Sequence, residues 1–194
     1  MIGQKKGPCK PEIVTLGIDA SLRGTGLCSL ELGSLHPYFL PEKKLTGVAR
    51  LVVLRARLSS YLDTLTRAPD IAVIEGYSYD SINRLSDIAE WGGQVKVELY
   101  ERDIPLIIAT PKQLKKFSTG SGDADKDKVM AAAQKKWGLY VDGIDNLADA
   151  AVLAKIGEVY LTGDSEYRSE LEVVKKIKAP KARKHEFRKL RGVV

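Results

Sequence analysis

Apolar residues follow two different spacings along the chain, and each spacing predicts one type of element. Short runs rich in β-branched and other apolar residues predict buried strands at residues 13–19, 27–32, 71–75 and 105–109. A weaker strand is expected at 35–45, where two prolines interrupt the pattern. Apolar residues three and four apart predict amphipathic helices at 48–65, 81–102, 124–137 and 146–160, and a short helical turn at 111–117.

The order of these elements predicts the fold class. The first three strands follow one another, and the tight connection at residues 21–26 predicts a hairpin between the first two. From residue 48 onward helices alternate with strands, which is typical of parallel strands joined by helices. We therefore expect an α/β fold with a five-stranded mixed sheet, its first three strands antiparallel, flanked by helices on both faces.

The expected helix at 81–102 contains an unusual pair, Gly92-Gly93. Each glycine costs about 1 kcal/mol of helix propensity relative to alanine. Close packing of this helix against another one would compensate for that cost.

Length and composition restrict the class of protein. A chain of 194 residues with 44% hydrophobic and 29% charged residues suits one globular domain with appendages. No stretch reaches the roughly 18 apolar residues of a spanning helix, and the polar start has no signal-peptide pattern, so we expect an intracellular, cytoplasmic protein with no membrane partner. Two cysteines and two histidines argue against a disulfide framework, a zinc site or a histidine triad, so any metal would be held by oxygen.

The net charge of +6 is concentrated at one end of the chain. Residues 171–194 hold nine Lys or Arg against two Glu, a charge of +7, which leaves −1 for the remaining residues. A tail of this kind suits a polyanion such as DNA. The alternative is a solvated tail that serves solubility or another partner.

Carboxylates stand at the ends of several predicted core elements. Asp19 and Glu75 each close a buried strand, and they would meet at one edge of the sheet if those strands are neighbours. Asp145 and Asp149 lie four residues apart at the start of the last predicted helix, where Asp145 could serve as the N-cap. Asp149 precedes an apolar helical body and therefore needs a partner or a cation.

Carboxylates gathered in this way would repel one another without a counter-ion. Mg²⁺ or Mn²⁺ supplies one through hard oxygen ligands, and two such ions support phosphodiester hydrolysis. The alternative is that the two strand-end acids are solvated, that Asp145 is only a cap and that Asp149 is only a surface acid.

Four segments resemble, in order, the motifs of RuvC-like Holliday junction resolvases of the RNase H-like superfamily. They are LGIDASLRGTG (16–26), IEGYSY (74–79), TPKQLKKFSTGSGDADKDKVM (110–130) and ADAAVLA (148–154). The resemblance implies an RNase H-like nuclease domain at residues 12–164, between a disordered segment at 1–11 and a basic C-terminal tail at 165–194. It implies a metal-dependent, structure-specific endodeoxyribonuclease that cuts Holliday junctions or other branched DNA by two-metal-ion hydrolysis. It also implies a homodimer, for which the helix containing Gly92 is our candidate interface.

The resemblance implies the site residues as well. Asp19, Glu75 and Asp149 would bind Mg²⁺, with Mn²⁺ able to substitute, and Asp145 would be the fourth ligand. Lys115 and Lys126 would complete the catalytic set by contacting phosphate or developing charge; in the absence of the motif they would be read as solvated lysines. The expected DNA contacts are Arg23, Tyr77, Tyr79, Lys112, Lys115, Lys116, Lys126, Lys128, Lys181, Arg183 and Lys184.

The chain departs from the family pattern at three places. Asn146 stands where bacterial enzymes carry the fourth acid, Tyr77 and Tyr79 flank the position expected for an aromatic wedge, and the basic tail lies outside the familiar core. These departures favour a phage-type enzyme, acting in the host cytoplasm, that also accepts flaps and forks.

Two other classes of protein remain as alternatives. A phosphotransferase of the actin and hexokinase type is one, because residues 17–26 also resemble a phosphate-binding hairpin, although that class needs two lobes. A non-catalytic branched-DNA-binding module is the other.

Overall fold

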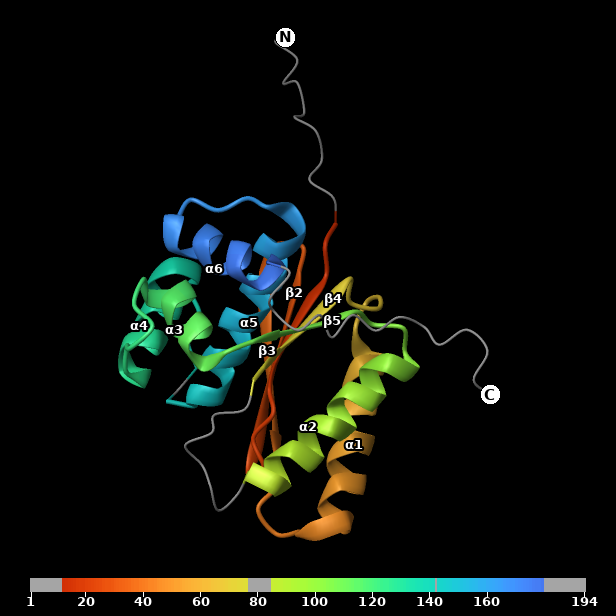
Figure 1. Ribbon diagram of the computed structural model, residues 1–194. Coiled ribbons are helices and arrows are strands. Elements are labelled where there is room, and N and C mark those ends of the chain that lie inside the picture. The colour runs from red at the N-terminus through yellow and green to blue at the C-terminus, as the bar shows by residue number, and fades with distance from the viewer. Residues whose placement is uncertain (1–11, 77–84, 142, 180–194) are drawn as a thin grey trace.

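A five-stranded mixed sheet forms the centre of the computed structural model, which describes residues 12–76, 85–141 and 143–179. The strands are β1 (Thr15–Asp19), β2 (Gly24–Glu31), β3 (Ser34–Pro41), β4 (Ile71–Glu75) and β5 (Leu106–Ala109). Their order in the sheet is β3-β2-β1-β4-β5 (Figure 1). The first three strands pair antiparallel and β1, β4 and β5 pair parallel, which confirms the predicted sheet.

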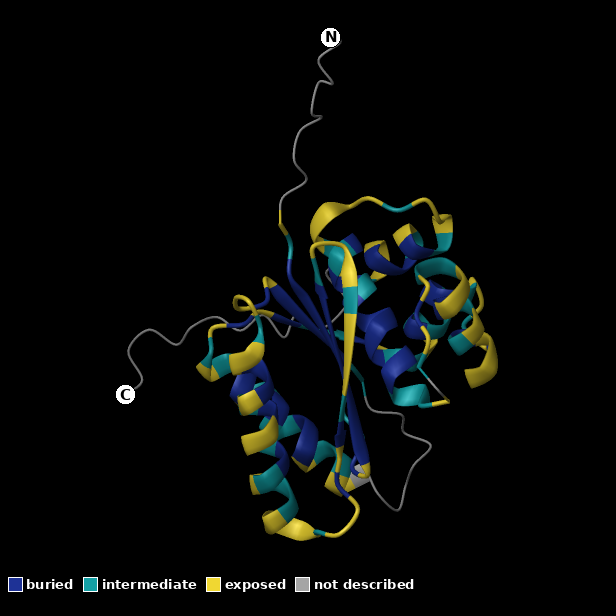
Figure 2. Cartoon of the chain, turned by 180° about the vertical axis from the view of Figure 1, so that it is seen from behind, coloured by how far each residue is buried: buried dark blue, intermediate teal, exposed yellow. Residues whose placement is uncertain are grey.

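Helices cover both faces of the sheet (Figures 1 and 2). They are α1 (Gly47–Thr64), α2 (Leu85–Glu101), α3 (Pro111–Thr119), α4 (Lys126–Trp137), α5 (Asp145–Thr162) and α6 (Arg168–Lys178). β1 shows why two faces are buried, because its side chains alternate between them. Leu16 and Ile18 belong to the core shared with α1 and α2, whereas Thr15 donates a hydrogen bond to the Ala154 carbonyl of α5 at 2.8 Å.

α5 lies against the sheet at an unusually short distance. A Cβ atom on Gly17 of β1 would lie 1.8 Å from the Ala150 carbonyl oxygen, and one on Gly26 of β2 would lie 2.1 Å from the Asn146 carbonyl oxygen. Alanines occupy much of the buried face of α5, which allows the helix backbone to come this close. The first turns of α5 are therefore held against the ends of β1 and β2.

Three local expectations need correction. The segment expected as a short turn is the nine-residue helix α3, which a capping box between Thr110 and Gln113 begins and Gly120, at φ 87°, ends. Asp145 is the first residue of α5 and not its N-cap, a position that Ile144 occupies without a side-chain cap. The third strand ends at Pro41. The expected start of the second helix at residue 81 lies outside the described residues.

The region expected to be a tail from residue 165 begins with a packed helix. Val173 and Val174 of α6 are buried in one core cluster with Phe117 and Val129, and buried Glu170 accepts a hydrogen bond from Lys136 of α4 at 2.8 Å. The cause is an amphipathic pattern, since the apolar residues of 168–178 fall on one face and the lysines elsewhere. Residues 180–194 lie outside the described residues. Every helix in the described part of the chain is too short or too polar to span a lipid bilayer.

Candidate metal centre

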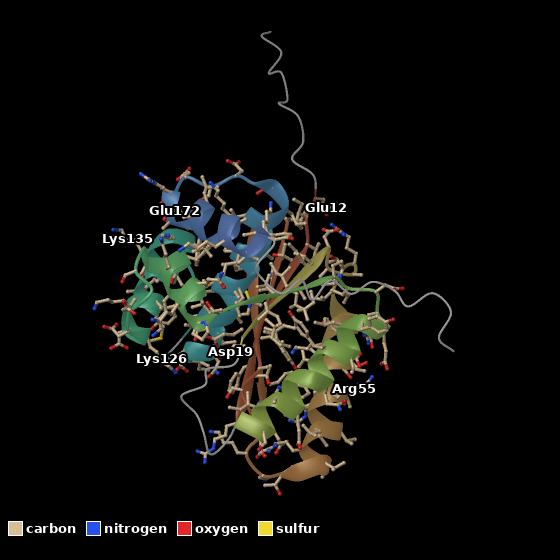
Figure 3. All side chains as sticks on the ribbon, in the orientation of Figure 1. Glu12, Asp19, Arg55, Lys126, Lys135 and Glu172 are labelled. Atoms are coloured by element: carbon tan, nitrogen blue, oxygen red, sulfur yellow. The ribbon has the colours of Figure 1, made fainter. Side chains whose placement is uncertain are left out.

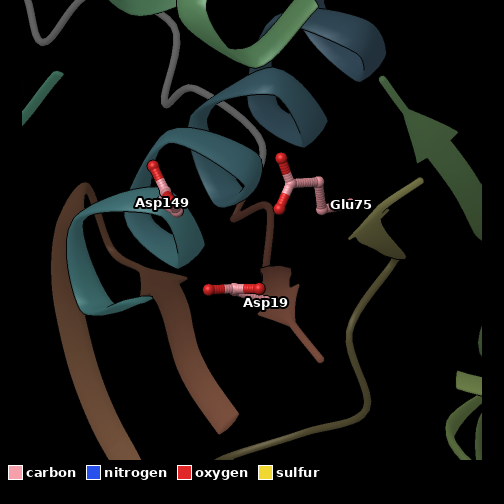
Figure 4. Close-up of side chains that lie close together, drawn as sticks. All are labelled: Asp19, Glu75 and Asp149. Atoms are coloured by element: carbon pink, nitrogen blue, oxygen red, sulfur yellow. The ribbon is translucent and has the colours of Figure 1, made fainter. Parts of the chain in front are cut away.

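Three carboxylates meet at the carboxyl edge of the sheet (Figure 4). Asp19 is the last residue of β1 and Glu75 the last of β4, and these strands are parallel neighbours, so both side chains emerge at the same edge. Asp149 comes from the second turn of α5, which packs on the same strands. One oxygen of each side chain lies within 4.8 Å of the others. We call these three residues the acidic cluster; their convergence agrees with the spatial expectation drawn from the sequence.

The protein compensates the charge of the acidic cluster incompletely. Burial and the neighbouring carboxylates, burial being the larger cause, raise the pKa of Asp19 to about 7 and that of Glu75 to about 8. Burial also raises the pKa of Asp149 to about 6. Buried carboxylates that resist ionisation in one another's presence are suited to a divalent cation, whose charge would reverse these shifts. The donor set, all carboxylate oxygen, fits a hard cation.

Two lysines lie close to the acidic cluster. Lys126, the first residue of α4, lowers the pKa of all three acids by its charge, and Figure 3 shows it beside Asp19. Lys115 of α3 lowers the pKa of Glu75 and Asp149 in the same way. Helix ends thus bring cations toward the carboxyl edge from the side of the sheet that α5 covers.

Asp145 lies near the acidic cluster but is not part of it. Its carboxylate pairs with the Lys126 ammonium, which lowers the pKa of Asp145 although burial acts in the opposite direction. The charge of Asp145 still raises the pKa of Asp19 and Asp149. The structure therefore does not place the expected fourth ligand within the cluster, because Lys126 holds it.

Asn146 makes a contact that sequence reasoning did not assign. Its side-chain amide donates a hydrogen bond to Asp19 Oδ2 at 2.6 Å. The signal in the sequence was the amide three residues before Asp149, at a position noted only as a missing acid.

The remaining residues expected to bind DNA are dispersed. Arg23 is exposed in the β1–β2 connection, and the Lys112 side chain is 84% exposed, with its ammonium 3.9 Å from Asp123. Lys128 pairs with Asp125, the N-cap of α4, at 2.9 Å. Lys116 is directed to α6, where it pairs with Glu172 at 2.8 Å. The other expected contacts, Tyr77, Tyr79, Lys181, Arg183 and Lys184, lie outside the described residues.

Comparison with known proteins gives a consistent result. A family model described as crossover junction endodeoxyribonuclease RuvC matches residues 15–155. The chain is similar to the crossover junction endodeoxyribonuclease RuvC of Hydrogenovibrio crunogenus, with 29% identity over 153 residues that cover 76% of this chain and 88% of the relative. The matched residues include the whole acidic cluster and end before α6.

Solved structures share the fold. A structure of Thermus thermophilus RuvC matches with a TM-score of 0.65 and 23% identity, covering 78% of this chain and 97% of that one. T. thermophilus RuvC in complex with a Holliday junction substrate matches with a TM-score of 0.62 and 22% identity, covering 73% and 90%.

Proposed function

The chain belongs to the family of RuvC crossover junction endodeoxyribonucleases, and from this premise we propose that it is a metal-dependent endonuclease that hydrolyses phosphodiesters at Holliday junctions or other branched DNA. The observation that carries the proposal is the acidic cluster, because three buried carboxylates from β1, β4 and α5 converge at one sheet edge. The related fold in complex with a Holliday junction substrate supports the choice of DNA.

In this proposal Asp19, Glu75 and Asp149 hold Mg²⁺, with Mn²⁺ able to substitute. When bound, such ions lower the pKa of a water and stabilise the leaving oxygen of the phosphodiester. The protein contributes rigidity, because each ligand stands at the end of a core strand or on a helix packed on those strands. Asp145 is the candidate fourth ligand, and it becomes free to join the set when Lys126 exchanges it for a phosphate oxygen.

Lys115 and Lys126 are the groups we propose to face the scissile phosphate. Both lie close enough to the acidic cluster to affect its pKa values, and a point cation beside the reacting phosphate stabilises the charge that develops there. Arg23, Lys112 and Lys128 are exposed and would contact the flanking backbone. The basic residues 180–194, with Lys181, Arg183 and Lys184 among them, would add sequence-independent affinity.

We propose a symmetric homodimer through the α1–α2 surface, since paired cuts across a junction require two sites. Val48 and Val52 of α1 are 75% and 62% exposed, and they line a shallow hollow between the two helices. On α2, Val97 is 42% exposed, and a Cβ on Gly93 would meet no atom within 4 Å. An apolar surface with a bare helical position suits close approach of a second helix.

A cleavage panel tests the proposal. Synthetic four-way junction, flap, fork and linear duplex are incubated with the protein in Mg²⁺, in Mn²⁺ and in EDTA. We expect metal-dependent nicking of the junction, loss of nicking in Asp19→Asn with DNA binding retained, and normal nicking in Asp123→Asn, whose side chain is 88% exposed. Equal cutting of flaps and forks would identify a broader branched-DNA endonuclease. Binding without cutting would identify a non-catalytic module, and ATP turnover without cutting a phosphotransferase.

A further inference from the structure

The hydrogen bond between Asn146 and Asp19 joins the first turn of α5 to the end of β1. The donor is the amide Nδ2–H of Asn146 and the acceptor is Asp19 Oδ2, at 2.6 Å. Asp19 belongs to the acidic cluster, so this bond acts directly on the orientation of a carboxylate that faces Glu75 and Asp149.

The backbone around this bond is built to bring the two residues together. Gly26 pairs with Asp19 across the β1–β2 ladder, and a Cβ at Gly26 would lie 2.1 Å from the Asn146 carbonyl oxygen and 3.1 Å from Asn146 Cβ. β2 is therefore bare at the point where the first turn of α5 rests. Gly17, one turn of the helix further on, allows the same close approach at Ala150. Main-chain packing, and not a mobile side chain alone, determines where the Asn146 amide lies.

An amide has a property at this position that a carboxylate lacks. It donates a hydrogen bond to Asp19 while adding no charge to a cluster that already holds three acids. An ionised aspartate at residue 146 could not donate, and it would repel Asp19. Asp145, the neighbouring acid, is held by Lys126 and does not perform this role.

We propose that Asn146 is a positioning residue whose amide N–H fixes the Asp19 carboxylate in the orientation that receives a divalent cation. This inference rests on the proposed function for the identity of the cation. It assigns to residue 146 a role through Asp19 and not as a ligand in its own right.

Nuclear magnetic resonance tests the contact without DNA or activity. Asn83 and Asn146 are the two asparagines of the chain, so selective ¹⁵N-asparagine labelling yields two side-chain amide pairs. The pair that disappears in Asn146→Ala belongs to Asn146. We expect one of its protons to be shifted downfield and slow to exchange with solvent, to remain so when Mg²⁺ is added, and to return to the ordinary range in Asp19→Ala.

Mn²⁺ binding by calorimetry tests the consequence. We expect Asn146→Ala to bind Mn²⁺ about tenfold more weakly than the wild type, equivalent to roughly 1.4 kcal/mol, while Asp123→Asn binds normally. An ordinary amide shift that ignores Asp19→Ala would overturn the proposal, and so would unchanged Mn²⁺ affinity in Asn146→Ala. An amide signal that moves when Mg²⁺ is added would show that Asn146 is itself a ligand, also against the proposal. If both measurements agree with expectation and no DNA is cut, the proposed function fails and the positioning role stands.

Discussion

Replacing Asp19 with asparagine should stabilise the metal-free protein while removing its response to metal. Burial and the neighbouring carboxylates raise the pKa of Asp19 from 3.8 to about 7. At about 1.4 kcal/mol per pH unit, ionising Asp19 at pH 8 costs the folded state on the order of 4 kcal/mol relative to a neutral side chain. Asparagine has the same shape, carries no charge, and keeps a carbonyl oxygen that can accept the hydrogen bond from Asn146.

Thermal melting in EDTA at pH 8 measures this effect. Since neighbouring groups relax, we expect Asp19→Asn to gain roughly 2–4 kcal/mol, which raises the melting temperature by roughly 5–10 °C for a protein of this size. Saturating Mg²⁺ should raise the melting temperature of the wild type, because a ligand that binds only the folded state stabilises it, and should change that of the variant little.

The matched control is Asp123→Asn, the same chemical change at a side chain that is 88% exposed. It should shift the melting temperature by less than about 2 °C and leave the Mg²⁺ response intact. A lower metal-free melting temperature in Asp19→Asn, or an Mg²⁺ response equal to that of the wild type, would refute the reasoning that Asp19 is a buried, uncompensated charge.

Three further predictions follow from other parts of the structure. The pKa values of the acidic cluster lie above their ordinary values in the folded state, so the stability these acids contribute is present near pH 4 and lost as pH rises through 6–8. Melting in EDTA should therefore fall from pH 5.5 to 8.5, and a flat profile would contradict this. Val173→Ala should lower the free energy of unfolding in urea by about 2 kcal/mol, whereas Leu171→Ala, 40% exposed on the same helix, should change it by less than about 0.5 kcal/mol; equal effects would show that α6 does not pack as described. Ending the chain at Ala179 removes six Lys or Arg; junction affinity should fall and the logarithmic salt dependence should lose about 0.9 per phosphate contact, while cutting at saturating DNA is unchanged, and an unaltered salt dependence would argue against DNA contact by these residues.

The acidic cluster was predictable because its members stand at positions that local sequence marks clearly. Asp19 and Glu75 end apolar β-branched runs, and runs of this kind become buried strands whose ends share one sheet edge. The alternation of strands and helices after residue 48 likewise predicted the parallel part of the sheet.

Features that depend on long-range side-chain geometry were not predictable. The pairing of Asp145 with Lys126 joins two helix ends and withdraws an expected ligand from the cluster. The amide contact of Asn146 requires that β2 be bare at Gly26, which no local pattern reveals. The packing of α6 was missed because its lysines dominated the interpretation, although Val173, Val174 and Ile177 form an apolar stripe of helical spacing.

The two bare strand positions under α5 set the depth to which that helix sinks onto the sheet. Because Gly17 and Gly26 meet helix main chain and not flexible side chains, even an alanine at either place would lift the helix bodily. Asp149 travels with the helix, whereas Asp19 stays with its strand, so a methyl group far from any charge would widen the gap between two ligands. The dimensions of the centre are thus a property of the backbone frame, and acids preserved in sequence would not suffice to preserve them.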